Sequence, residues 1–400
     1  MEIAYPAYIA EVLARLSAAG EEAYLVGGSL RDALLGIPAH DFDVATSARP
    51  ETTLAVFADH RVIETGIKHG TVTVIADGQP VEITTFRCDG DYTDGRHPDS
   101  VRFTDRITED LSRRDFTVNA MAYHPDRGLV DPFDGQHDLE ARILRAVREP
   151  HLRFDEDSLR ILRAFRFAAQ LGFDIEPDTL AAAADCREGI SRIARERVAA
   201  EFIRLVCSPD AARAIGLMQR AGVLSYVTGD FVPDARALSV LSEMPAEDTA
   251  RLGVYFFGAK PENIKEILQA LRCSTRQVRG TMAVARGASM RVTNEREATA
   301  LRAAVGEYAA AAIRASVLLG ISPAEAEALV VNNRVPTTVA ELAVTGKDLL
   351  ALGFAGREVG ETLTYLLETV MANPAYHNKE TLLALCEARL RKNQREGDVK

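Results

Sequence analysis

The pattern of hydrophobic positions changes near residue 140 of this 400-residue chain. Before that point, short runs of β-branched and aromatic residues lie between Gly, Asp and Pro residues, a pattern that predicts strands. Helical segments are expected among them, at residues 31–35 and 51–58, so this part is predicted to be a mixed α/β domain. The expected strands are residues 24–26, 42–44, 71–75 and 81–85.

After residue 139 the strand signals nearly vanish, and Ala, Leu, Arg and Glu dominate. Leu159, Leu162, Phe165 and Ala169 fall on one face of a helix, which indicates packing against a core. The remainder of the chain is therefore predicted to be all-helical. Within the first part, residues 87–98 have no apolar period and predict a long functional loop.

Composition narrows the classes of function. The chain has 47 Lys and Arg against 58 Asp and Glu, a net charge of −11, which argues against nucleic-acid binding by bulk charge. A local basic groove is compatible with that balance, and residues 142–166 hold seven Arg against four acids. Five scattered cysteines without a C-x-x-C pair give little support for disulfides or a cysteine zinc site. The N-terminus predicts an amphipathic helix rather than a secretory signal, and no apolar run could span a membrane, so a cytoplasmic protein is expected.

A first candidate site begins at Gly27-Gly28, directly after the strand at residues 24–26. Two glycines at a turn between strand and helix let the backbone approach a ligand, and the free amides beyond favour an anion such as phosphate. Ser29 is expected to cap the following helix. Taken alone, such a glycine pair is more often a plain turn.

Two carboxylates follow, because Asp41 and Asp43 are two residues apart on the short strand predicted at residues 42–44. Their side chains are expected on one face, where a divalent cation such as Mg²⁺ would relieve the like-charge repulsion. Two such ions could activate an attacking hydroxyl and hold a triphosphate. Glu82 could join this cluster from an adjacent strand or face solvent. The alternative is an exposed turn with two Asp residues.

A second unit, at residues 111–122, combines Arg113 and Arg114 with Asp115 and Asn119. The guanidinium groups suit phosphate, and Asp115 could orient one of them or accept a hydrogen bond from a ribose hydroxyl. Asp115 and Asn119 would share a face if this segment were a helix. The alternative is a helix start with a surface charge cluster.

A third unit places Arg160, Arg163 and Arg166 at three-residue spacing on a helix whose first turn is expected to carry residues 155–157. Asp157 and Arg160 form an i,i+3 pair that could read the hydrogen-bonding edge of a base. The alternative is an ordinary helix with internal salt bridges.

Together these units resemble the class II tRNA nucleotidyltransferase family, the CCA-adding enzymes and their poly(A) polymerase relatives. The segment L-V-G-G-S-L-R-D with D-F-D resembles the first family motif, R-R-D-F-T-V-N-A-M-A the second, and E-D-S-L-R-I-L-R-A-F-R-F the nucleotide-reading helix. D-P-F-D-G-Q-H-D-L, at residues 131–139, is also typical. The match runs from residue 24 to 201 and is weaker beyond, where Arg357 stands at a position at which Pro is common.

The resemblance implies an α+β fold: a DNA polymerase beta-like nucleotidyltransferase head with a mixed sheet, followed by all-helical parts. These would be a head at residues 1–145, a neck with the nucleotide-reading helix at 146–207, a body at 208–335, and a tRNA-binding tail at 336–400. Asp41 and Asp43 would be the catalytic carboxylates that bind two Mg²⁺ ions, with Glu82 as a third carboxylate seen in some members.

The resemblance also implies a substrate-binding set that contacts the nucleotide or supports those contacts. Gly27, Gly28 and Arg31 would hold the triphosphate, and Arg195 and Arg197 would support the reading helix or bind tRNA. The second unit would meet the ribose and phosphates, and the third would choose the base, with the residues Arg113, Arg114, Asp115, Asn119, Glu156, Asp157, Arg160 and Arg163.

The implied activity is addition of C, C and A to the tRNA 3′ end from CTP and ATP, without a membrane or an obligate protein partner. Residues 87–98 would control the change from C to A. Alternatives within the family are a poly(A) polymerase or a partial enzyme that adds only CC or only A. A different class would be an inactive tRNA-binding protein of the same fold.

Overall fold

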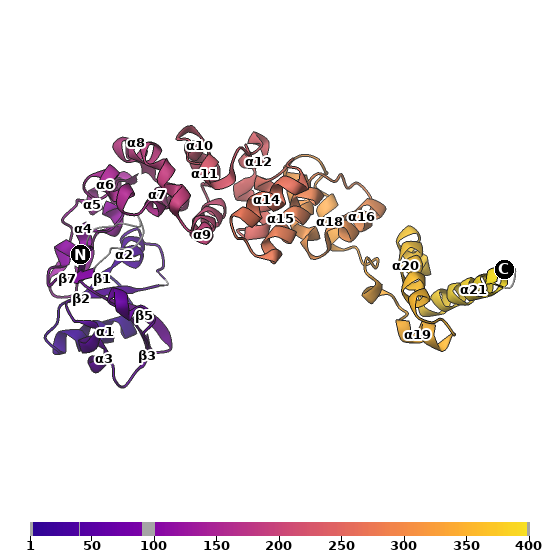
Figure 1. The fold of residues 1–400 in the computed structure, drawn as a ribbon, viewed down its shortest axis with the longest axis horizontal. Coiled ribbons are helices and arrows are strands. Elements are labelled where there is room, and N and C mark those ends of the chain that lie inside the picture. The colour runs from indigo at the N-terminus through magenta and orange to yellow at the C-terminus, as the bar shows by residue number, and fades with distance from the viewer. Residues whose placement is uncertain (1–2, 40, 90–100, 398–400) are drawn as a thin grey trace. The chain divides into compact units, whose positions relative to one another are not determined.

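Figure 1 shows a computed structural model of the chain, which describes residues 3–39, 41–89 and 101–397. The chain divides into two compact units, Met1–Phe231 and Val232–Lys400. Among the described residues, all strands belong to the first unit, whereas the second is helical. The predicted α+β fold, a mixed sheet followed by helices, is confirmed.

A mixed sheet forms the centre of the N-terminal part of the first unit. β2 and β5 are parallel neighbours, and the other neighbouring strands pair antiparallel. All four residues of β1 are buried, which explains its continuous apolar sequence. In order across the sheet, the strands are β3 (Arg61–Ile63), β4 (Thr71–Ala76), β5 (Gln79–Thr85), β2 (Asp43–Thr46), β1 (Ala23–Val26), β8 (Ala122–His124) and β9 (Gly128–Val130).

The predicted strands at residues 24–26, 71–75 and 81–85 lie within β1, β4 and β5. Three helices accompany the sheet: α1 (Ala7–Ala18), α2 (Gly27–Leu34) and α3 (Pro50–Val56). The predicted cap at Ser29 is wrong, because α2 already begins at Gly27. Ser29 therefore lies in the first turn, where its Oγ donates to the carbonyl oxygen of Val26 at 3.2 Å.

The segment predicted as a loop at residues 87–98 begins as a strand. β6 (Arg87–Asp89) pairs antiparallel with β7 (Val101–Phe103). Residues 90–98 of the prediction lie outside the described residues.

The rest of the first unit is helical except for one short pair of parallel strands, β10 (Ile143–Leu144) and β11 (Asp174–Ile175), which corrects the all-helical expectation. The predicted stripe on α7 is confirmed: Leu159, Leu162, Phe165 and Ala169 are all buried. The helices of this part are α4 (Ile107–Ser112), α5 (Gly135–Ala141), α6 (Pro150–Glu156), α7 (Leu159–Leu171), α8 (Pro177–Asp185), α9 (Arg195–Val206), α10 (Ala211–Arg220) and α11 (Ser225–Thr228).

The second unit contains two separate apolar clusters, one around Leu301 and Ile313 and one around Leu349 and Leu366. Within the described part of the chain, no helix has the length and apolar character needed to cross a membrane. The helices of this unit are α12 (Ala235–Ser239), α13 (Asp248–Tyr255), α14 (Pro261–Ala270), α15 (Thr275–Ala288), α16 (Glu295–Val305), α17 (Ala309–Leu318), α18 (Ala326–Val331), α19 (Gly346–Ala351), α20 (Arg357–Ala372) and α21 (Lys379–Gly397).

Candidate active site

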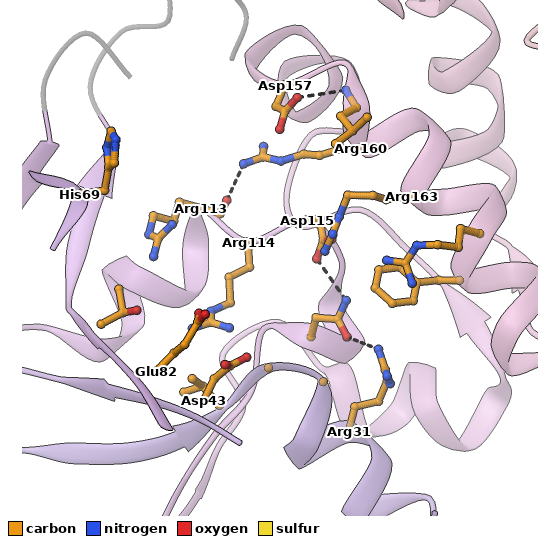
Figure 2. A pocket seen from close by; sticks show the side chains of 18 of the residues that line it. Arg31, Asp43, His69, Glu82, Arg113, Arg114, Asp115, Asp157, Arg160 and Arg163 are labelled. Carbon is orange, nitrogen blue, oxygen red and sulfur yellow. Dashed lines mark hydrogen bonds and ion pairs between the residues drawn. The ribbon is translucent and has the colours of Figure 1, made fainter. Parts of the chain in front are cut away.

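A cavity of about 640 Å³ in the first unit brings together most of the predicted site residues (Figure 2). Strands β2 and β5 and the start of α2 contribute to one part of its wall, and α7 contributes to another. Three of the predicted residues, Asp41, Glu156 and Arg195, are not part of the lining. The predicted residues that do line it are Gly27, Gly28, Arg31, Asp43, Glu82, Arg113, Arg114, Asp115, Asn119, Asp157, Arg160, Arg163 and Arg197.

The glycine turn lies against the carboxylate of the first motif. Gly27 has φ +75°, a conformation that favours glycine. A Cβ atom at this position would lie 3.1 Å from Asp43 Oδ2 and 3.5 Å from Arg114 Nη1. Glycine therefore allows both the turn and the close approach of the backbone to two charged side chains.

Asp43 and Glu82 are direct partners in the register of the parallel strands β2 and β5. Figure 2 shows the two carboxylates next to each other, with Arg114 nearby. Burial, followed by the charge of Glu82, raises the pKa of Asp43 to about 6; Arg114 opposes this rise and Asp41 adds to it. The structure thus brings Glu82 to Asp43, one of the two options that its sequence left open.

Asp41 is placed differently from the sequence expectation. The two aspartates were expected to share one face of a strand, but β2 begins only at Asp43. The alternation of side chains along a strand therefore does not apply to Asp41, which is exposed. Its charge still contributes to the raised pKa of Asp43.

The chemistry of these carboxylates fits a hard divalent cation. Carboxylate oxygens are preferred ligands of Mg²⁺, and the positive charge of Arg114 offsets only part of the effect of burial and of the second acid on Asp43. Among the residues that the structure describes, no group of three or more His, Cys, Asp or Glu side chains is arranged to hold a metal ion. Of the four acidic side chains that line the cavity, those of Asp43 and Glu82 are direct partners in the strand register.

A buried chain of hydrogen bonds joins α2, which follows the glycine turn, to α7. Arg31 Nη1 donates to Asn119 Oδ1 at 2.8 Å, and Asn119 Nδ2 donates to Asp115 Oδ1 at 3.2 Å. Arg163 donates to Asp115 Oδ2 through Nε at 2.8 Å and Nη2 at 2.6 Å. Figure 2 shows how these contacts connect Arg31 to Arg163.

Asp115 and Asn119 meet without sharing a helix, which corrects the sequence expectation. α4 ends at Ser112, and residues 117–119 form a separate 3₁₀ turn. Burial would raise the pKa of Asp115, but the charge and hydrogen bonds of Arg163, with Asn119, hold it at about 2. Asp115 is therefore an ionised, fully partnered anchor between the two parts of the cavity wall.

The acids of the third unit do not lie on the helix that carries its arginines. α6 ends at Glu156, Asp157 is extended, and α7 begins at Leu159, so residues 155–157 do not form the first turn of α7. Glu156 Oε2 accepts from Arg160 Nη1 at 2.7 Å. Asp157 Oδ1 instead accepts from the backbone amide of Leu159 at 3.0 Å.

Asp157 and Arg160 both reach the cavity, but they are not paired with each other through their side chains. Arg160 Nη2 donates to the carbonyl oxygen of Arg113 at 2.8 Å, and Asp157 Oδ2 accepts from Arg197 Nη2 at 3.4 Å. Arg197 lines the cavity, whereas Arg195 Nη1 donates to the carbonyl oxygen of Tyr226. Of the two arginines predicted to support this face, Arg197 reaches the cavity, whereas Arg195 connects α9 to α11.

The arginine-rich segment at residues 142–166 is mostly neutralised within the unit. Five of its seven arginines form ion pairs with acids, and the paired residues are Arg145 with Asp138 and Glu176, Arg153 and Arg160 with Glu156, Arg163 with Asp115, and Arg166 with Glu201. The segment is therefore less basic as a surface than its sequence indicates.

Several lining residues were missed by the sequence analysis. Phe167 lies under three guanidinium groups, with those of Arg31, Arg163 and Arg166 at 5.1, 5.2 and 3.8 Å from its ring centre. Arg166 and Phe167 fall within the third motif, and Gln170 lies one turn after Arg166 on α7, whereas no motif marks His69, Thr84 or Arg87. The lining residues with polar or aromatic side chains that the sequence analysis gave no role in the site are His69, Thr84, Arg87, Arg166, Phe167 and Gln170.

Family models match three successive parts of the chain. Residues 23–145 match the poly(A) polymerase head domain. Residues 172–233 match the "Probable RNA and SrmB- binding site of polymerase A", and residues 249–386 match tRNA nucleotidyltransferase domain 2. The cavity draws its residues from the first match, from the segment between the first and second matches, and, with Arg197, from the second match.

The chain is also similar over nearly its full length to characterised relatives. It is 34% identical to a CCA-adding enzyme of Enterococcus faecalis, with 96% of this chain and 97% of the relative covered. It is 35% identical to a CCA-adding enzyme of Pediococcus pentosaceus, with the same shares covered. The crystal structure of the Bacillus stearothermophilus CCA-adding enzyme in complex with CTP matches with a TM-score of 0.83 and 30% identity, covering 98% of this chain and 100% of that one.

Proposed function

The chain belongs to the family of CCA-adding enzymes, and on that basis we propose that it adds C, C and A to the 3′ end of tRNA from CTP and ATP. It is an enzyme, a nucleotidyltransferase. The observation that carries the proposal is the single cavity in which the carboxylate of Asp43 faces arginines from three successive sequence motifs. The guanidinium groups can bind the phosphates of a nucleoside triphosphate and stabilise the pyrophosphate that leaves, and the carboxylate can hold a metal ion at the reacting phosphate.

In the proposed reaction, the 3′ hydroxyl of the tRNA gives up its proton to water, and its oxygen forms a bond to the α-phosphorus of the nucleotide. The bond from that phosphorus to the oxygen bridging to the β-phosphate breaks, and pyrophosphate leaves. Gly27, Gly28 and Arg31 are proposed to hold the triphosphate, and Arg113 and Arg114 to contact its phosphates. The positive charge of these side chains would stabilise the negative charge that develops on the leaving group.

Enzymes of this family generally use divalent metal ions. For this chain we propose two Mg²⁺ ions, with Asp41, Asp43 and Glu82 as the carboxylates that bind them. Such ions supply Lewis-acid stabilisation of phosphate oxygens and favour ionisation of an attacking hydroxyl. The burial of Asp43 directly beside Glu82, which together raise the pKa of Asp43, supports this assignment.

Base choice is proposed to depend on Asp157 and Arg160, with Glu156 and Arg163 as their supports. Glu156 holds the Arg160 guanidinium at 2.7 Å, and Asp115 holds that of Arg163 at 2.6 Å. A carboxylate and a guanidinium fixed at one cavity wall can offer an acceptor and donors to the edge of a base. Asp115 and Asn119 are proposed to position this wall against the ribose.

For the remaining organisation we propose the four-part division into head, neck, body and tail at residues 1–145, 146–207, 208–335 and 336–400. The tail would bind tRNA, and the enzyme would act in the cytoplasm. Because most arginines of residues 142–166 are paired, binding of tRNA would depend on few cations in this segment.

One experiment tests the proposal and separates it from its alternatives. A tRNA that ends at the discriminator base is incubated with CTP, with ATP, or with both, and the 3′ ends are sequenced. CCA addition predicts CC with CTP alone and CCA with both nucleotides. A tract of A residues would indicate a poly(A) polymerase, addition limited to CC or to A a partial enzyme, and no extension an inactive binding protein.

A further inference from the structure

Asp110 is a buried acid that lies behind the cavity wall. It is on α4, its side chain is only 1% exposed, and it does not line the cavity. An ionised carboxylate in such a position is costly unless cations and hydrogen bonds compensate it. None of the three sequence motifs included this residue.

The carboxylate of Asp110 is shared by the two arginines of the second motif. Its Oδ1 accepts from Arg113 Nε at 3.0 Å and Nη2 at 2.8 Å, and its Oδ2 lies 3.2 Å from Arg114 Nη2. Oδ1 also accepts from the backbone amide of Arg87 at 3.3 Å. All three arginines line the cavity, so one hidden carboxylate contacts each of them.

Arg114 lies between two carboxylates of different function. Nη2 contacts Asp110, whereas the charge of Arg114 acts on Asp43 and opposes the rise of its pKa. The Nε atom of Arg114 is buried and has no hydrogen-bond partner. Without Asp110, the guanidinium of Arg114 would be free to turn toward Asp43 and form a direct ion pair there.

We propose that Asp110 is a positioning residue, which fixes the guanidinium groups of Arg113 and Arg114 in the orientation that receives the phosphates of the nucleotide. This inference deepens the proposed function and rests on it for the identity of the ligand. Asp110 does not touch the nucleotide and acts through the two arginines. Their alignment before binding would lower the cost of ordering two long side chains around a triphosphate.

The neighbouring residue Glu109 provides a matched control. It lies on the same helix and is also acidic, but its Oε2 accepts from Thr104 Oγ1 at 2.5 Å and from Cys88 Sγ at 3.1 Å. Glu109→Gln removes one negative charge from the same helix while leaving the carboxylate at the arginines in place.

The experiment measures binding in the absence of tRNA, by calorimetry, with CTP and with inorganic triphosphate as probes. Asp110→Asn is expected to weaken both by a similar factor of roughly tenfold or more, whereas Glu109→Gln leaves both unchanged. In an Arg114→Gln background, Asp110→Asn should reduce the affinity for both probes by a clearly smaller factor, because one of the partners of Asp110 is already absent. Wild-type CTP affinity in Asp110→Asn, or an undiminished loss in the Arg114→Gln background, would overturn the proposal.

If Asp110→Asn does not fold, Asp110→Glu retains the charge, displaces the carboxylate by one methylene, and is expected to weaken both probes as well; unchanged binding in this variant would equally overturn the inference. Failure of the proposed function would have a different signature, since the wild-type protein itself would then not extend the tRNA to CCA.

Discussion

Gly27 lies so close to Asp43 that a methyl group on the glycine would come within 3.1 Å of the Oδ2 atom of Asp43. This contact couples the turn after β1 to the carboxylate at the start of β2. Gly27 is therefore expected to affect the position of the Asp43 carboxylate as well as the conformation of the turn.

Gly27→Ala is expected to lower the rate of nucleotide addition by roughly 100-fold, because the new methyl group displaces Asp43 or the turn. The substitution also costs about 1–2 kcal/mol of backbone strain at positive φ. Gly36→Ala is the matched control: Gly36 has φ +70°, but a Cβ there has no atom within 4 Å. Single-turnover rates and thermal unfolding of both variants separate the two effects. Equal activity of the two variants would contradict the proposed role of the contact.

Asp157→Asn is expected to reduce the preference for the correct nucleotide by roughly tenfold or more, since an amide replaces one of two acceptor oxygens with a donor. The measurement is the ratio of kcat/KM for CTP to that for UTP at the first added position. Asp155→Asn is a suitable control, because Asp155 is exposed and lies two residues earlier on α6. A lower rate with an unchanged ratio would show that Asp157 does not contribute to base choice.

Asp115 gives a prediction about pH. Its pKa of about 2 in the folded protein lies below the ordinary value of an Asp side chain, so its ionisation stabilises the fold above about pH 4. This contribution, about 2 kcal/mol, is lost as the pH falls from about 4 toward 2. Urea unfolding of the wild type and Asp115→Asn should show a stability difference at pH 6 that shrinks steadily below pH 4. A difference independent of pH would mean that the ion pair with Arg163 is not its source.

The sequence was sufficient to predict the strands near the site, because β1, β4 and β5 carry continuous or alternating apolar residues. It also identified many of the residues that gather around the cavity, since motif similarity does not depend on exact element boundaries. The partners of those residues were less predictable. Arg160 pairs with Glu156 rather than with Asp157, because α6 ends at Glu156 and leaves Asp157 in an extended conformation.

Asp110 shows a second limit of sequence reasoning. Its significance depends on burial and on the two guanidinium groups folded back over it, three and four residues later. The sequence alone leaves such an acid indistinguishable from Glu109, which has different partners. Tertiary contacts of this kind become visible only once the path of the chain after α4 is known.

Nucleotide addition is proposed to take place at the carboxylates of the first motif. The most direct test compares the wild type with the Asp41→Ala, Asp43→Ala double variant, using a tRNA that ends at the discriminator base together with CTP and ATP. We predict CCA ends for the wild type and no extension for the variant. Circular dichroism is used to confirm that the variant is folded. Incorporation of CTP by the double variant would contradict the account.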